Sequence, residues 1–353
     1  MSQQPKHAFR HLLVVMTDRH IGNLLVSLYA IKAAQQQLNG SQTISCVIDY
    51  HLLSLATFFL PDIDFIPCNI RGTKLSLWKK LKLFVRMVIT LRRRHIDTAV
   101  DLYGHSESHM IARLSGADFT SAFYSRPKLV DKYHWSRRDS KLSPVHQVDS
   151  YLFPFFPVLG QLTAAALKAP KQPAIYRQVE KILASLHISQ DKPLVVIHPG
   201  AGKDYKLWPS KHWQQLIALL ESHGRQVLLI GAAADRSEVE AIMTDQSISP
   251  VNGFECFNLI ETIHLGNICE YMIGNDSGPT HLMATTATRV YSIFGPTNST
   301  LWAPLSDNSH IIQSPEPCLK ACSKQVCARD IRCLEKLSAK AVFDQLNLSA
   351  SQT

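Results

Sequence analysis

The sequence predicts an α/β protein built from two doubly wound, Rossmann-like domains. Short apolar segments alternate with longer amphipathic ones along the 353 residues, as expected of strands that are each followed by a helix. The alternation stops at a Pro-containing linker, residues 168–173, and then starts again. We therefore expect a first domain over 1–168, a second over 169–335, and a C-terminal helix and tail over 336–353.

The first domain opens with a strand, a loop and a helix. Leu12–Met16 is apolar throughout, and Leu24–Leu38 carries apolar residues at helical spacing. The loop between them holds Asp18 and His20, and it lacks the GxGxxG pattern of dinucleotide sites.

A later strand, Thr98–Leu102, carries Asp101 near its carboxyl end. Open α/β sheets bind their ligands at that end of the strands, so this carboxylate is placed for chemistry or for sugar hydroxyls. Residues 127–143 are polar and basic, and we expect a loop there.

The second domain centres on residues 271–296. Tyr271–Gly274 predicts a strand, a turn-forming Asn-Asp-Ser-Gly-Pro follows, and Thr280–Thr286 predicts a helix. The start of such a helix offers backbone N–H groups that suit a phosphate. Alternatively, Asp276 or Ser277 is an ordinary N-cap.

The net charge of +9 is concentrated in the first half. Residues 1–168 hold 21 Lys and Arg against 11 Asp and Glu, whereas residues 169–353 hold 16 against 17. An excess confined to one half favours an anionic partner, such as a membrane surface, an acidic glycolipid or nucleic acid, over a role in solubility alone.

Residues 65–96 contain nine Lys and Arg and no acidic residue. An apolar face at helical spacing runs through Leu77, Leu81, Phe84, Val88 and Leu91, with Trp78 and Val85 beside it. Such a basic amphipathic helix fits a membrane surface, and it fits equally well a helix packed on the sheet with a solvated basic edge. Nucleic acid is disfavoured, because the stretch lacks interleaved aromatic residues and a recognised binding fold.

No apolar stretch approaches the length that spans a bilayer. The N-terminal residues also lack the apolar core of a signal peptide. We therefore expect a cytoplasmic protein.

Four segments resemble the bacterial lipopolysaccharide heptosyltransferases, a glycosyltransferase family. HPGAGKDYKLWPSKHWQQL (198–216) is similar to the family's His-Pro-Gly … Lys-x-Trp-Pro … Trp pattern. IGNDSGPTHLMA (273–284) is similar to its Gly-Asn-Asp-Ser-Gly-x-x-His signature. The segments 96–108 and 318–346 resemble a weaker family element and a Cys-rich tail found in some members. The resemblance therefore spans nearly the whole chain.

The resemblance implies the GT-B fold, with an acceptor-binding first domain, a nucleotide-sugar-binding second domain and the site in the cleft. It implies an inverting sugar transfer without metal or other cofactor, from ADP-heptose to the anionic inner core of lipopolysaccharide. Because that glycolipid lies in the inner leaflet, the implied location is cytoplasmic and peripheral on the inner membrane. Two alternatives are the same fold with another nucleotide-sugar and a catalytically weak binding or scaffold protein.

By the same resemblance, Lys206 is the cation that stabilises the leaving diphosphate, and Asp235 lies where members often contact the ribose. The implied donor loop comprises Asn275, Asp276, Ser277, Gly278, Thr280 and His281. A carboxylate beside a diphosphate would repel it, so we expect Asp276 to bind sugar hydroxyls or to cap the helix.

The general base departs from the family's pattern. Members usually carry Gly-Asp at the start of the first helix, and that Asp is taken as the base, whereas this chain has Gly22-Asn23. An amide cannot accept a proton at neutral pH. Either Asp18 or His20 in the same loop serves instead, or Asp101 does, or the protein is catalytically weak.

The tail carries Cys318, Cys322, Cys327 and Cys333. Their spacing lacks the paired C-x2-C of strong zinc sites, so a metal site, a redox-sensitive or structural cluster, and reduced core thiols all remain open. No metal-ligand set is predicted. Ser338–Leu346 is expected to form a C-terminal helix, which in GT-B folds crosses back to the first domain.

Overall fold

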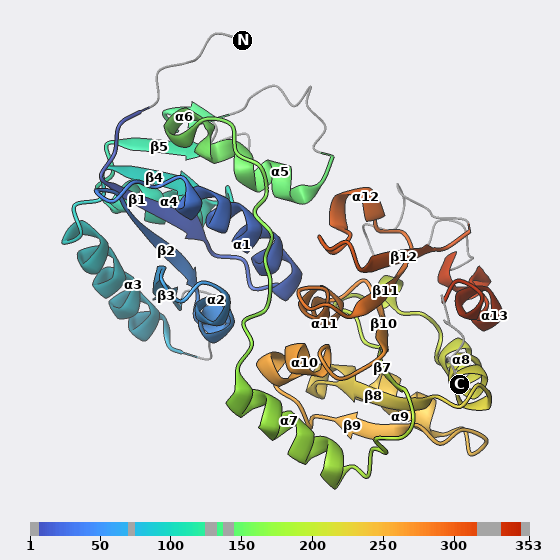
Figure 1. Cartoon of the computed structure of the whole chain (residues 1–353). Coiled ribbons are helices and arrows are strands. Elements are labelled where there is room, and N and C mark those ends of the chain that lie inside the picture. Colours follow the sequence, from blue (N-terminus) through green and yellow to red (C-terminus); the bar gives the residue numbers. More distant parts are fainter. Residues whose placement is uncertain (1–6, 70–74, 124–132, 137–144, 316–332, 347–353) are drawn as a thin grey trace. The chain divides into compact units, whose positions relative to one another are not determined.

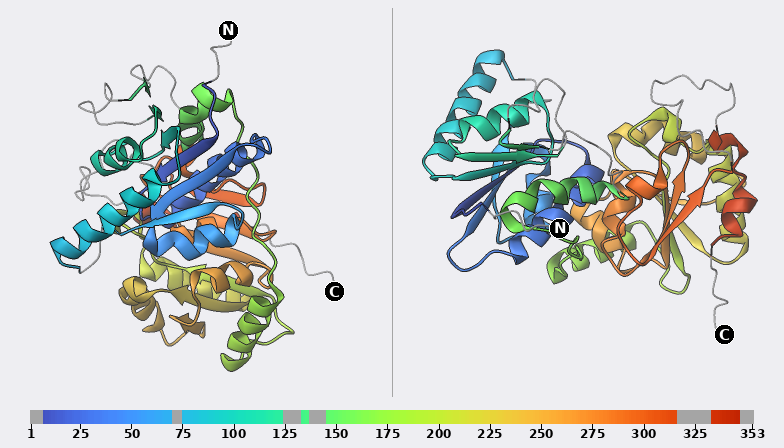
Figure 2. Two further views of the ribbon diagram at one scale, coloured as in Figure 1. Left: turned by 90° about the vertical axis from the view of Figure 1, so that its left-hand side faces the viewer. Right: turned by 90° about the horizontal axis from the view of Figure 1, so that it is seen from above.

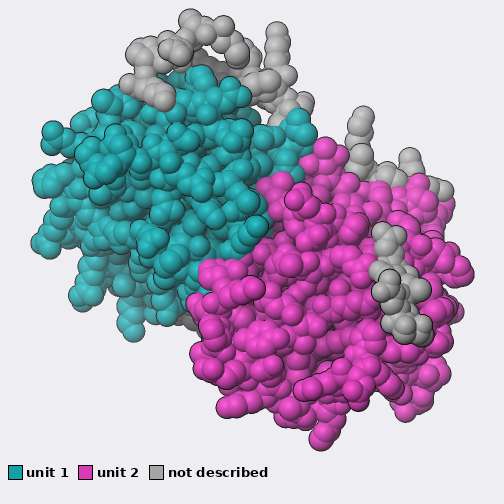
Figure 3. Space-filling view, viewed as in Figure 1, with its two compact units in different colours: residues 1–168 teal, residues 169–353 magenta. Residues whose placement is uncertain are grey.

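A computed structural model describes residues 7–69, 75–123, 133–136, 145–315 and 333–346. The chain forms two compact units, residues 1–168 and 169–353 (Figure 3). Within the described residues, each unit is organised around one parallel sheet of six strands. Helices flank both faces of each sheet (Figures 1 and 2).

The sheet of the first unit has the strand order β3-β2-β1-β4-β5-β6. Its strands are β1 (His11–Met16), β2 (Thr43–Asp49), β3 (Asp64–Cys68), β4 (Thr98–Asp101), β5 (Phe119–Ala122) and β6 (Trp135–Ser136). The order reverses between β1 and β4, which makes this the switch point where open α/β sheets bind ligands. Val15 pairs with Asp101 there, so the loop after β1 lies beside the end of β4.

The helices of the first unit cover its sheet on two sides. They are α1 (Ile21–Gln36), α2 (Leu53–Phe59), α3 (Leu77–Arg92), α4 (Ser106–Leu114), α5 (Gln147–Leu152) and α6 (Phe156–Leu159). Alternate strand residues point to opposite faces. One face, with Leu13 and Val15, packs on Met87 and Leu91 of α3 and on Ile111 of α4. Helix α1 lies on the other face (Figure 1).

The second unit repeats the same order, as β12-β11-β10-β7-β8-β9. Its strands are β7 (Leu194–His198), β8 (Gln226–Gly231), β9 (Val251–Phe254), β10 (Tyr271–Asn275), β11 (Arg289–Phe294) and β12 (Ser309–Gln313). The switch point now falls between β7 and β10. His198 pairs with Gly274 in that register, so the residues that follow β7 and β10 start side by side.

Two apolar clusters cover the faces of the second sheet. Its helices are α7 (Pro173–Ser185), α8 (Ser210–Ser222), α9 (Arg236–Met243), α10 (Leu259–Leu265), α11 (Gly278–Met283), α12 (Ser299–Trp302) and α13 (Ala339–Phe343). Residues of α8, α9 and α13 form one cluster, together with the buried side chains of Trp208 and Trp213. Residues of α7, α10 and α11 form the other.

Three features differ from the expectations drawn from the sequence. The expected C-terminal helix, α13, belongs to the second unit, where Val342 and Phe343 pack with α8. The strand β6 lies within the stretch expected to be a loop. Helix α7 begins at Pro173, a residue that was assigned to the linker and that is well suited to the first turn of a helix. No helix in the described ranges is long and apolar enough to cross a membrane.

Candidate functional site

The loop after β1 gathers three of the predicted residues around one carboxylate. Oδ1 of Asp18 accepts the backbone N–H of His20 at 2.8 Å and lies 2.6 Å from Nδ1 of its ring. Oδ2 accepts the side-chain amide of Asn23 at 2.6 Å. The carboxylate is thus held from both sides, and Asn23 serves as a donor to it.

Asp18 and His20 differ in exposure, and this difference bears on where their shared proton lies. Asp18 is only 6% exposed, whereas the side chain of His20 is 76% exposed. Burial raises the pKa of Asp18, but the hydrogen bonds from His20 and Asn23 outweigh it, and the pKa lies below its ordinary value. The carboxylate is therefore ionised at neutral pH, and it fixes an N–H on Nδ1 of His20.

Asp101 ends β4 and has no exposed surface. Its Oδ1 accepts the backbone N–H groups of Tyr103 and Gly104, at 2.8 and 2.9 Å, and its Oδ2 accepts the hydroxyl of Tyr133 at 2.5 Å. Burial is the largest influence and holds the pKa of Asp101 above its ordinary value, against the effect of these hydrogen bonds. Asp101 therefore braces the loop after β4, where Gly104 has a positive φ of 64°.

In the second unit, Lys206 meets the loop after β10. Its Nζ donates to Oδ2 of Asp276 at 2.6 Å, and the two side chains are 23% and 6% exposed. The pairing places a cation at the switch point and offsets the negative charge of Asp276.

Neighbouring hydrogen bonds fix this loop. The fully buried Asn275 donates its side-chain amide to the backbone O of Pro199 at 2.6 Å, and it accepts the backbone N–H of Trp208 at 3.3 Å. The indole N–H of Trp208 in turn donates to the backbone O of Leu337 at 2.8 Å. Asn275 is thus a structural link between β10 and the segment after β7.

A buried chain of polar contacts joins three loops of the second unit. Nε2 of His198 lies 3.3 Å from Oδ2 of Asp235, and its Nδ1 lies 3.1 Å from Oγ of Ser277. Ser277 contacts Oγ1 of Thr280 at 3.1 Å, and Thr280 donates to the backbone O of Asn275 at 2.8 Å. Burial raises the pKa of Asp235, but His198 and a backbone N–H outweigh it, so the pKa lies below its ordinary value.

The side chain of Asp235 leaves no room for a Cβ at Gly200 unless the carboxylate moves. A Cβ added there would lie 1.9 Å from Oδ1 of Asp235, whereas a Cβ on Gly202 would meet nothing within 4 Å. The segment after β7 thus passes directly against the carboxylate expected to contact the ribose.

Ser277 is the N-cap of α11, which begins at Gly278 rather than at Thr280 as predicted. Its side chain makes no hydrogen bond to the helix backbone, because the hydroxyl faces His198 and Thr280 instead. His281 is buried in the same short helix. Ser277 therefore occupies the N-cap position that was expected, but its hydroxyl does not cap the helix.

The sequence analysis missed two residues of these sites. His198 was quoted only as part of a motif, although its place at the carboxyl end of a buried strand is a usable signal. Tyr133 lies in the stretch expected to be a loop and carried no signal. Cys318, Cys322 and Cys327 lie outside the described residues, and Cys333 is buried in the core of the second unit. Across the described ranges, no three His, Cys, Asp or Glu side chains are grouped as a metal site would require.

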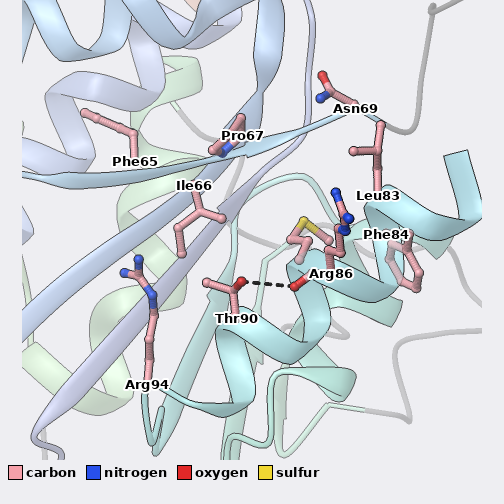
Figure 4. Close-up of a pocket in the computed structure, with 10 residues that line it drawn as sticks. Phe65, Ile66, Pro67, Asn69, Leu83, Phe84, Arg86, Thr90 and Arg94 are labelled. Carbon is pink, nitrogen blue, oxygen red and sulfur yellow. Dashed lines mark hydrogen bonds between the residues drawn. The ribbon is translucent and has the colours of Figure 1, made fainter. Parts of the chain in front are cut away.

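A cavity of about 300 Å³ lies elsewhere, between β3 and α3 (Figure 4). Apolar side chains such as Ile66 and Met87 line it, together with Arg86, Thr90 and Arg94. None of the predicted site residues lines this cavity.

Solved structures share this architecture. The structure of a family 9 glycosyl transferase from Veillonella parvula matches with a TM-score of 0.79 at 17% identity, covering 95% of both chains. Escherichia coli ADP-heptose lps heptosyltransferase II matches with a TM-score of 0.73 at 18% identity, covering 96% of this chain and 97% of that one. Two doubly wound sheets with these neighbours define a GT-B type fold.

The chain belongs to glycosyltransferase family 9: residues 84–331 match the family model described as "Glycosyltransferase family 9 (heptosyltransferase)". It is similar to lipopolysaccharide heptosyltransferase 3 of Escherichia coli, with 24% identity over 254 residues, 68% of this chain and 71% of the relative. It is also similar to lipopolysaccharide heptosyltransferase 1 of Escherichia coli, with 22% identity over 349 residues, 93% of this chain and 99% of the relative.

Proposed function

We propose that this enzyme transfers heptose from ADP-heptose to the core of lipopolysaccharide or a related glycan, with inversion and without a metal ion. The observation that carries the proposal is the Lys206–Asp276 pair at the switch point of the second unit. The names of the relatives support the choice of sugar and acceptor. A structural neighbour, Escherichia coli heptosyltransferase WaaC, has been solved with ADP and with ADP-2-deoxy-2-fluoro heptose.

We assign the donor to the second unit and the acceptor to the first. Lys206 would stabilise the charge that grows on the diphosphate as it leaves, the task that a metal ion performs in other transferases. Asp276, which is ion-paired with Lys206, would contact sugar hydroxyls, and Asp235 would contact the ribose. His198 would act as a positioning residue, because it touches both Asp235 and Ser277.

We assign the role of general base to His20, with Asp18 as its partner. Asp18 is buried and ionised, and it fixes the proton of His20 on Nδ1, which leaves Nε2 to accept the proton of the acceptor hydroxyl. The hydroxyl oxygen would attack the anomeric carbon while the bond to the diphosphate breaks, and ADP would leave. Asn23 then takes the place of the expected Asp by holding Asp18.

Asp101 is not assigned a role in proton transfer. Its two oxygens already accept hydrogen bonds from Tyr103, Gly104 and Tyr133, and it has no exposed surface through which an acceptor hydroxyl could reach it. It would instead support the loop after β4 in the acceptor-binding unit.

Calorimetric titration of the purified protein with ADP, UDP, GDP and CDP, and with their common sugar conjugates, tests the donor assignment. Binding of ADP and ADP-heptose alone, undiminished by EDTA, is the expected result. Preference for another nucleotide would keep the fold and discard the heptose assignment. An absence of binding to every nucleotide would favour a scaffold protein. Transfer to a soluble core oligosaccharide, followed by mass spectrometry, tests the acceptor.

A further inference from the structure

Helix α3 exposes a continuous apolar ridge. Leu77 and Trp78 are 82% and 81% exposed, and Leu81, Val85 and Ile89 are each between 45% and 49% exposed. These are five of the eleven large apolar side chains that the described residues leave exposed. Scattered exposed apolar residues need no explanation, whereas a contiguous row of them marks an interaction surface.

The ridge is separate from the face by which α3 packs on the sheet. Successive side chains of an α-helix are rotated by about 100° around the helix axis. Viewed along that axis, the five ridge residues fall within an arc of about 120°. Met87 and Leu91 are buried on a different arc, where they join the core of the first unit. The sequence analysis placed Leu77, Leu81 and Leu91 on one face, and the structure corrects this: Leu91 faces the core, and the other two face outward.

A basic band borders the ridge. Lys79, Lys82, Arg86 and Arg93 fall within an arc of about 60° next to the ridge, and all four are exposed. Helix α3 has no acidic residue. Among the described residues, no acidic side chain forms an ion pair with any of these four cations. Arg92, the last residue of α3, falls within the arc of the ridge. Its Nε donates to the backbone O of Leu114 at 3.0 Å.

We propose that α3 is a membrane-docking helix, whose ridge enters the interface of an anionic bilayer while its basic band contacts the lipid headgroups. Charge complementarity selects this occupant, because interfacial helices combine an apolar face with a Lys- and Arg-rich one, and an anionic bilayer satisfies both. A second copy of this chain is a poorer partner, since two identical basic bands would repel each other. The proposal extends the proposed function, in which the acceptor is a lipid, but it can be tested without any sugar transfer.

Co-sedimentation of the full chain with vesicles tests the proposal. We expect binding to vesicles of phosphatidylglycerol and phosphatidylethanolamine, weaker binding at high salt, and little binding to phosphatidylcholine alone. The double variant L81Q/V85Q removes the middle of the ridge and should lower vesicle binding about tenfold or more. The double variant K79Q/K82Q should lower it by about tenfold through lost headgroup contacts.

Matched controls separate α3 from the rest of the surface. Val145 is 73% exposed outside α3, so V145Q should bind vesicles as the wild type does. Lys171 and Lys181 are exposed in the second unit, so K171Q/K181Q controls for charge alone. Circular dichroism and ADP affinity of the ridge variants should match the wild type, because the changed side chains lie at the surface of the first unit.

Trp78 provides a direct readout of insertion. Brominated phosphatidylglycerol should quench its fluorescence, and a W78F variant should still bind vesicles while losing most of the quenching. Undiminished vesicle binding by L81Q/V85Q would overturn the proposal. So would a wild-type dimer that L81Q/V85Q converts to a monomer without lipid, because the ridge would then be covered by a second copy. If transfer fails with every acceptor while vesicle binding depends on the ridge, the proposed function fails and the docking helix stands.

Discussion

The side-chain amide of Asn23 donates a hydrogen bond to Oδ2 of Asp18 at 2.6 Å. The family's usual Asp is therefore replaced by a group that holds a different carboxylate in the same loop. That carboxylate contacts the ring of His20 through its other oxygen. The loop thus contains an Asp–His pair in which the exposed imidazole, rather than the buried carboxylate, is accessible to a substrate.

Replacing His20 by Gln tests the assignment of the base. We expect kcat to fall about 10²- to 10⁴-fold with little change in ADP affinity, because the proposed donor site belongs to the other unit. An imidazole base also predicts an acid limb in the rate profile, because protonation of the ring removes its capacity to accept the proton of the acceptor hydroxyl. If Asp18 were itself the base, H20Q would retain activity and the acid limb would lie below pH 3.8, the ordinary carboxyl value from which the pKa of Asp18 is lowered.

Replacing Asn23 by Asp should lower the rate of transfer, although it restores the residue that the family usually carries. A second carboxylate would lie within hydrogen-bond distance of Asp18, and like charges at that distance force one of the two to keep a proton. The matched variant is N23S, which removes the amide without adding a charge. A large rise in the N23D rate would show that Asn23 marks a degenerate site and would contradict the Asp–His assignment.

Replacing Lys206 by Ala should remove most of the affinity for ADP, because the diphosphate would lose its cation and meet an unpaired Asp276. Loss of one charge-assisted contact is expected to weaken binding by at least about tenfold. The control is K203A, since Lys203 is exposed three residues earlier in the same segment. Calorimetry measures both variants, and undiminished ADP affinity in K206A would remove Lys206 from the donor site.

Replacing Gly200 by Ala should weaken the binding of ADP while causing only a modest loss of folding stability. The new Cβ would overlap Oδ1 of Asp235, whose carboxylate would have to turn away from His198 and from the proposed ribose contact. A terminal carboxylate can move, so the loss of folding stability should stay within about 1–3 kcal/mol. G202A has open space at its Cβ and should behave as the wild type. Equal ADP affinities in the two variants would contradict the placement of Asp235 at the ribose.

Replacing Asp101 by Asn should change the pH dependence of stability. The pKa of Asp101 lies above its ordinary value of 3.8, so the folded state binds this proton more tightly than the unfolded chain does. Its stabilising contribution is therefore complete below 3.8 and is lost as the pH rises through the folded-state value.

We expect D101N to gain in unfolding free energy relative to the wild type as the pH rises above 3.8, as measured by urea denaturation. D62N, at an exposed carboxyl, serves as the control. A difference between D101N and the wild type that stays constant over this range would rule out the raised pKa.

The sequence predicted the fold because its strands are buried on both faces and so read as continuous apolar runs, as in Leu194–His198. It did not predict β9 or β12, in which few residues are fully buried and which include polar ones, the exposed Asn252 and the partly buried His310. The order and the register of the strands could not be predicted from the sequence either. It is the pairing of β7 with β10 that brings His198 beside the loop after β10. The contacts of Asn23 and Tyr133 depend on side-chain positions that no local pattern encodes.

The indole of Trp208 is hydrogen-bonded to Leu337, near the C-terminal end of the described chain. A ribosome makes the chain from its N-terminus, and domains generally fold in that order. The first unit can therefore fold while the second is still being synthesised. The segment that carries Lys206, by contrast, has to wait for Leu337, 129 residues after Trp208, before its anchor exists. A chain released before Leu337 is made would therefore lack this anchor.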